Sequence, residues 1–218
     1  MNNSVSRDFE DLVNDLEDYS DKVLYPYLKI HIFGPYEGDC FGFLTEIKYR
    51  LQEYGFEQTK ICVDRDSDPP STASDEELNE YISDESVQFL QEADVAIFFF
   101  LDHIFERPEL PQRALNECEP PSDDIKDPNS SVSGELLCWT TDYDSEKEQA
   151  FVIFEGDMYN SIGSVIAGRP ESTDLDYTRI DSEDIDTATA QVRQRAMNWA
   201  MNEYRDILKK RHTSDQLS

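Results

Sequence analysis

The segment EADVAIFFFLD, residues 92–102, contains seven consecutive apolar residues, Val95 to Leu101. Such a run, bounded by carboxylates, is typical of a β-strand that is buried on both faces, because it lacks the polar alternation of a half-exposed strand. Strands of this kind occur in parallel sheets that helices cover on both sides. The segment therefore predicts an α/β protein with a parallel sheet at its centre.

Other segments extend this pattern on both sides of residues 92–102. Strands are expected at 28–33, where apolar residues alternate, and at 59–64, 149–154 and 176–180. Helices are expected between them: one that Gly55 ends, one after the capping-box pair Ser74 and Glu77, a short one at 134–139, and a terminal one at 185–209. Strands that alternate with helices predict a flavodoxin-like or Rossmann-like parallel sheet of about five strands with helices on both faces.

The domain organisation is expected to be simple. Residues 1–23 carry an apolar stripe at helical spacing and are predicted to form a helical extension. Residues 24–212 form one α/β domain, in which the acidic stretch 103–133, with five prolines, is an insertion. Residues 213–218 are expected to be a disordered tail.

Charge is the strongest compositional signal. The 218 residues include 48 Asp and Glu against 19 Lys and Arg, a formal net charge of −29, and the acidic residues are spread along the chain. We interpret this as the acidic surface of a halophilic protein, because strong salt screens the self-repulsion; the alternative is an acidic protein from ordinary salt. The lack of cationic groups disfavours nucleic-acid binding, because phosphate contacts need them.

Nothing in the sequence indicates a metal, a cofactor or a membrane segment. The four cysteines form no CxxC pair and have no histidine at ligand spacing, so no metal site is expected. Neither GxGxxG nor a P-loop is present, no signal peptide is recognised, and no segment approaches the length of a membrane span. We expect a cytoplasmic protein without a cofactor.

The carboxyl ends of the predicted strands define the candidate site, because ligands bind there in open parallel sheets. These ends bring together Gly34-Pro35-Tyr36, Asp64, Asp102 and the segment 155–157. A helix that begins near Gly134 places Ser131, Ser133 and Glu135 at the same edge, where free N–H groups attract anions. Each of these features also has a structural explanation, as a turn, a helix cap or a surface carboxylate.

Four segments in this order resemble the nucleoside 2-deoxyribosyltransferase-like superfamily. The stretch IFGPY (32–36) is similar to that family's first strand and Gly-Pro-aromatic turn, and EADVAIFFFLD to its hydrophobic strand with a terminal aspartate. The stretch SVSGELLCW (131–139) resembles its loop leading to a glutamate at a helix start, and YNSIGSVIAG (159–168) the segment that carries an asparagine.

This resemblance implies a flavodoxin-like fold and cleavage or transfer of N-glycosidic bonds. Glu135 would be the nucleophile or would stabilise the oxocarbenium ion, and Asp102 would orient it or handle protons at the leaving base. Tyr36 would stack on the base, and Asn160 would hold the sugar or a neighbouring subunit. The implied ligand is a nucleoside or nucleotide.

Two other functional classes stay open. The chain could be a noncatalytic sensing or interaction module of the same fold, with residues 103–133 and the N-terminal helix as its partner surface. A receiver-like phosphotransfer domain is disfavoured, because Gly34-Pro35 occupies the position where receivers carry paired acids. Trp199 on the apolar face of the terminal helix leads us to expect a homodimer.

Overall fold

The computed structural model describes residues 24–36, 38–61, 86–102, 111–115, 129–142, 150–159, 176–180 and 185–215. Its elements, in chain order, are η2 (Tyr25–Tyr27), β1 (Ile30–Phe33), α2 (Gly38–Glu53), β2 (Lys60–Ile61), β3 (Val95–Phe100), α4 (Gln112–Leu115), α5 (Ser130–Asp142), β4 (Ala150–Glu155), β5 (Asp176–Ile180) and α7 (Ile185–Asp215). Residues 86–91 are also helical. The predicted N-terminal helix and the Ser74 capping box lie outside the described residues.

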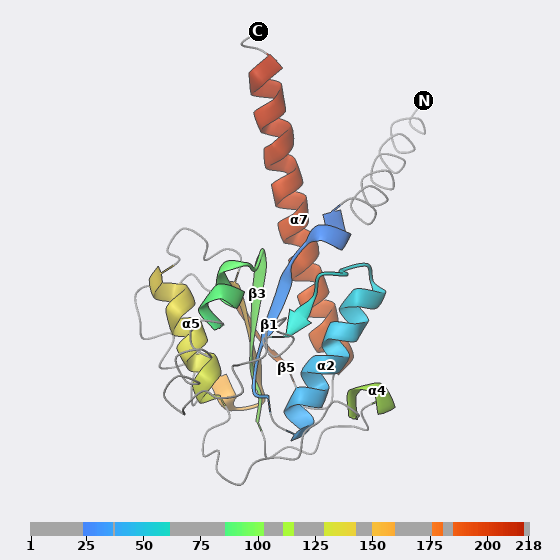
Figure 1. Ribbon diagram of the computed structural model, residues 1–218, viewed down its shortest axis with the longest axis vertical. Helices are drawn as coiled ribbons and strands as arrows, with labels where there is room; N and C mark the ends of the chain where they lie inside the picture. The colour runs from blue at the N-terminus through green and yellow to red at the C-terminus, as the bar shows by residue number, and fades with distance from the viewer. Residues whose placement is uncertain are drawn as a thin grey trace, which may run out of the picture.

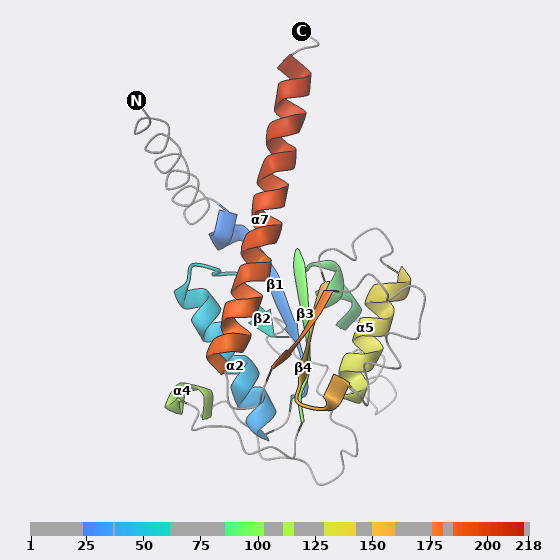
Figure 2. The same cartoon turned by 180° about the vertical axis from the view of Figure 1, so that it is seen from behind.

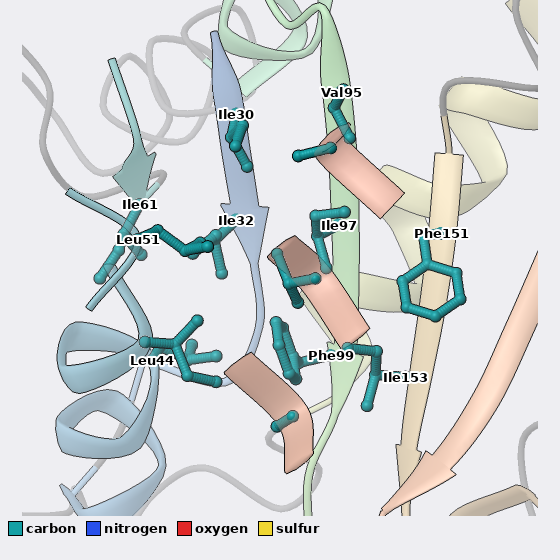
Figure 3. Close-up of a cluster of buried hydrophobic side chains, with 14 of the residues drawn as sticks. Ile30, Ile32, Leu44, Leu51, Ile61, Val95, Ile97, Phe99, Phe151 and Ile153 are labelled. Atoms are coloured by element: carbon teal, nitrogen blue, oxygen red, sulfur yellow. The ribbon is translucent and has the colours of Figure 1, made fainter. Parts of the chain in front are cut away.

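The five strands form one parallel sheet in the order β2-β1-β3-β4-β5. Figure 3 shows the strands in that order. Ile61 marks β2, Ile97 marks β3 and Phe151 marks β4, and β5 lies beyond β4. This is the flavodoxin-like strand order, in which the chain runs outward from β1 to β2 and then returns past β1 to β3. The prediction of a parallel sheet with helices on both faces is confirmed.

Helices cover both faces of the sheet (Figures 1 and 2). On one face, residues of α2 and α7 pack against Ile30, Ile32, Ile97 and Phe99; we call this the α2-side cluster (Figure 3). On the other face, residues 86–91 and α5 pack against side chains from β1, β3 and β4, which we call the α5-side cluster.

Strand β3 explains why the core has two layers. Ile97 and Phe99 lie in the α2-side cluster, whereas Phe98 and Phe100 lie in the α5-side cluster, and all four side chains are fully buried. Because successive side chains of a strand point to opposite faces, an unbroken apolar run serves both layers. Each buried side chain of this size contributes about 1.5–3 kcal/mol relative to exposure. The interpretation of residues 95–101 as a strand buried on both faces is confirmed.

The strand and helix ends differ from the predictions by a few residues. Strand β2 covers only Lys60–Ile61 of the predicted 59–64, and residues 62–64 lie outside the described part. The carboxylate of Asp94 accepts a hydrogen bond of 2.9 Å from the Lys29 N–H at the amino edge of the sheet. Gly55, with a φ of 98°, follows the end of α2 as the predicted cap.

Helix α7 is longer than the apolar pattern suggests. It continues to Asp215, six residues beyond the predicted end and three residues into the predicted tail. Residues 210–215 contain no apolar side chain, so the periodicity stops before the helix does. Figures 1 and 2 show that the carboxyl half of α7 extends beyond the amino edge of the sheet.

Candidate functional site

The candidate site lies at the carboxyl edge of the sheet, between the ends of β1 and β3. In the strand order 2-1-3-4-5, β1 and β3 are neighbours, and helices α2 and α5 lie on opposite faces of the sheet; ligands bind at this place in sheets of this kind. Gly34-Pro35-Tyr36 follows β1, and Leu101 and Asp102 follow β3. Two groups of predicted site residues therefore come from adjacent strands, which pair in register up to Phe33 and Phe98.

The turn after β1 is packed tightly onto α2. A Cβ atom on Gly34 would lie 2.5 Å from Cδ1 of Leu44, so any larger residue would displace this fully buried leucine. Gly34 is therefore needed for the close approach of the strand end to the helix. Pro35 is also buried, whereas Tyr36 is half-buried and packs against both core clusters. Tyr36 thus contacts both layers of the core at the carboxyl edge of the sheet.

Asn129 joins the start of α5 to the end of β3. Its side-chain Nδ2 donates to the Leu101 carbonyl oxygen at 2.9 Å, and its Oδ1 accepts from the Leu101 N–H at 3.1 Å. Both residues are buried, so these bonds satisfy the backbone N–H and C=O of Leu101. Sequence reasoning missed Asn129; the available signal was an asparagine directly before a helix, a position this residue type favours.

Helix α5 begins at Ser130, four residues before the predicted start near Gly134. The Ser133 hydroxyl donates to the Asn129 carbonyl oxygen at 2.9 Å from within the first turn, so Ser133 is not the N-cap residue. The prediction placed the start too late because the serine-rich segment 130–133 has no apolar periodicity.

The predicted residues on α5 divide between two faces of the helix. Ser131 and Gly134 are exposed, whereas Glu135 is only 9% exposed and lies on the same side as Val132 and Leu136, which pack on the sheet. Long helical side chains lean toward the helix N-terminus, which directs the Glu135 carboxylate toward the carboxyl edge. Glu135 on α5 and Asp102 after β3 are thus the candidate acids near this edge.

Glu155 at the end of β4 adds a carboxylate that sequence reasoning had noted only as a strand end. It is fully buried, and its Oε2 accepts a hydrogen bond of 2.6 Å from the Asp102 N–H. This bond holds the backbone at Asp102 in place. The ends of β3 and β4 are therefore joined directly beside the candidate acid.

His31 has a structural role in β1. Its Nδ1 lies 2.7 Å from the Phe89 carbonyl oxygen, and its ring stacks on that of Phe89 at a centroid distance of 3.9 Å. Burial lowers the pKa of His31 from 6.5 to about 4, although the hydrogen bond to Phe89 opposes this shift. The ring is thus neutral at pH 7, and Nδ1 donates to the carbonyl.

A cluster of charged side chains lies between α2 and α4, and the sequence did not predict it. The buried Glu46 carboxylate accepts bonds of 2.8 and 2.9 Å from Arg113 of α4 and a bond of 2.8 Å from Arg50. Arg50 also contacts Asp186 of α7, and Arg113 contacts Glu53. Burial by itself would raise the pKa of Glu46, but the bonds from Arg113 and Arg50 hold that pKa below its usual value.

Two predicted ligand-binding residues, Asp64 and Asn160, lie outside the described residues. Within the ranges that the structure describes, no group of three His, Cys, Asp or Glu side chains is arranged to hold a metal ion. In the same ranges, no helix is both long enough and apolar enough to cross a membrane.

Fold and site together define an α/β protein with a flavodoxin-like parallel sheet that carries Asp102 and Glu155 at its carboxyl edge. Comparisons with protein-family models, with curated proteins and with solved structures find no match for the chain.

Proposed function

We propose that this protein binds a nucleoside or nucleotide at the carboxyl edge of its sheet and cleaves or transfers the N-glycosidic bond there. The supporting observation is the Asn129–Leu101 pair, because it fixes the start of α5, the helix of Glu135, beside the end of β3 and Asp102. The Gly34-Pro35-Tyr36 turn borders the same edge from β1.

The proposed chemistry needs an aromatic surface and two carboxyl groups. Tyr36 stacks on the base. As the C–N bond breaks, positive charge develops at the anomeric carbon, and the Glu135 carboxylate stabilises or traps it. The electron pair of the bond leaves with the base, which takes a proton from Asp102, and water or a second base then attacks the sugar. Glu155 holds the backbone of Asp102 through the 2.6 Å bond.

The proposed setting is a cytoplasm of high salt. In the described residues, seven carboxylates are exposed: Asp39, Glu53, Glu57, Glu92, Asp157, Asp176 and Asp186. At about 1 M salt the Debye length falls to about 3 Å, which removes most of the repulsion between such groups. Binding and activity are therefore to be measured in molar KCl.

Replacing Tyr36 by leucine is expected to weaken nucleoside binding. Leucine keeps apolar contact with both core clusters but removes the aromatic surface, and stacking on a base contributes about 1–3 kcal/mol, or about 10- to 100-fold in the dissociation constant. Calorimetric titration with a panel of nucleosides and nucleotides in molar KCl measures the effect.

The matched control is Tyr54→Leu, because Tyr54 is 50% exposed and lies after α2, away from the carboxyl edge. This variant should bind as the unchanged protein does. Equal affinities for the Tyr36 and Tyr54 variants would contradict the assignment of Tyr36 to the site.

A further inference from the structure

Strand β5 lies at one edge of the sheet that the described residues form. It is the last strand in the order and pairs in parallel with β4 along all five of its residues. Within the described chain, no other strand pairs with it. Tyr177 and Arg179 are exposed on this edge strand, and Thr178 between them is partly exposed.

One hydrogen bond shows which backbone N–H and C=O groups of β5 point toward β4 and which point away from it. The Gly156 N–H donates to the Ile180 carbonyl oxygen at 2.9 Å, so the polar groups of Ile180 face β4. Backbone polar groups alternate between the two sides of a strand, so those of Thr178 and Asp176 face β4 as well. The N–H and C=O groups of Tyr177 and Arg179 therefore point outward.

We propose that β5 pairs in antiparallel fashion with β5 of a second copy of this chain, about a twofold axis at Thr178. In that register Tyr177 lies opposite the partner's Arg179, and both residues have outward N–H and C=O groups. Each Tyr177 thus forms a hydrogen-bonded antiparallel pair with the partner's Arg179, and the twofold axis makes two such pairs. Thr178 lies opposite the partner's Thr178 in a non-hydrogen-bonded pair, in which the Cα atoms are closer. The inference does not depend on the proposed function.

Side chains on this edge are compatible with such pairing. The rings of Tyr177 and Tyr159 stack at 5.1 Å, and the guanidinium of Arg179 lies 4.0 Å from the centroid of Tyr159. Among the described residues, Arg179 forms no ion pair. Across the twofold axis, the cationic Arg179 would face the aromatic ring of the partner's Tyr177, a favourable cross-strand pair.

Salt should favour this association. Each copy carries a net charge of −29, so two copies repel each other until the charges are screened. We therefore expect the dimer population to rise with KCl concentration. If ion pairs between the copies were the main attraction, the dimer population would fall as the KCl concentration rises.

Cysteine substitution tests the register directly. In a non-hydrogen-bonded antiparallel pair the Cα atoms are about 4.5 Å apart, a distance that a disulfide can span. Thr178→Cys is thus expected to form a disulfide between two copies in molar KCl, identified by mass spectrometry of the joined peptides. Tyr177→Cys is the control, because position 177 lies about 7–8 Å from its own copy and faces position 179.

A second variant tests the edge without a disulfide. Arg179→Pro removes an N–H that points outward, and it removes no hydrogen bond to β4. Because each copy loses one hydrogen bond across the interface, the variant should weaken the dimer about 10- to 100-fold. Sedimentation measures this change, and circular dichroism verifies the fold. A protein that stays monomeric in molar KCl, or a dimer that Thr178→Cys does not cross-link, would overturn the proposal.

Discussion

Replacing Asn129 by alanine is expected to lower the free energy of unfolding by about 3–5 kcal/mol. The change removes both hydrogen bonds to Leu101 and leaves one buried N–H and one buried C=O without these partners. Each such unsatisfied group costs about 1–3 kcal/mol. Denaturant titration at a constant molar concentration of KCl measures the loss.

Two control variants give this test its specificity. Ser130→Ala changes an exposed neighbour at the start of α5 and should alter stability by less than about 0.5 kcal/mol. Asn129→Asp keeps an acceptor for the Leu101 N–H but removes the donor to its carbonyl oxygen, so it should also be clearly destabilising. A loss below about 1 kcal/mol for Asn129→Ala would show that the pair does not anchor α5.

Glu46→Gln is expected to destabilise the protein by about 3 kcal/mol. The Glu46 side chain is only 2% exposed, and its charge compensates Arg50 and Arg113 at the contact between α2 and α4. Removing one member of a buried ion pair costs about 3–5 kcal/mol. Because the side chains of Arg50 and Arg113 are 27% and 40% exposed and the amide oxygen remains, we expect this variant at the lower end. Thermal or denaturant unfolding measures the effect.

Glu53→Gln is the matched control. Glu53 contacts the same arginine, but its side chain is 61% exposed. Exposed pairs contribute about 0–1 kcal/mol, so this variant should be nearly neutral. If the two variants lose equal stability, the burial of Glu46 is not the source of the effect.

The ionisation of Glu46 determines how the stability of the protein changes with pH. Its pKa in the folded protein lies below the ordinary value of 4.5, so the folded state binds the proton more weakly than the unfolded state does. The stabilisation is thus present above about pH 4.5 and is lost as the pH falls through the folded pKa. Glu46→Gln should reduce the acid sensitivity of unfolding in this range.

The sequence predicts the fold well where hydrophobic patterns are strong. The apolar run from Val95 to Leu101 predicts a strand because its length suits a buried strand, whereas a buried helix needs about 10–12 residues or more. The carboxyl edge then follows from the alternation of strands and helices, and with it the positions of Tyr36 and Asp102.

Sequence reasoning missed residues whose partners are distant in the sequence. Asn129 bonds to Leu101 across 28 positions, and Glu46 bonds to Arg113 across 67. A carboxylate in the middle of a helix in so acidic a chain is usually exposed, and no local pattern shows that Glu46 is buried. Long-range polar pairs of this kind require the tertiary structure.

The most direct test of the proposed function is release of base from nucleosides, deoxynucleosides and NAD by purified protein in about 2–3 M KCl. Chromatography of the products should show free base, and Glu135→Gln should lower the rate by about 100-fold or more, since a fixed charge at a transition state contributes about that much. The exposed Glu57→Gln is the control and should leave the rate unchanged. Folded protein that binds a nucleoside but releases no base would contradict the catalytic proposal and leave a binding module, and release that persists in Glu135→Gln would contradict the role of Glu135.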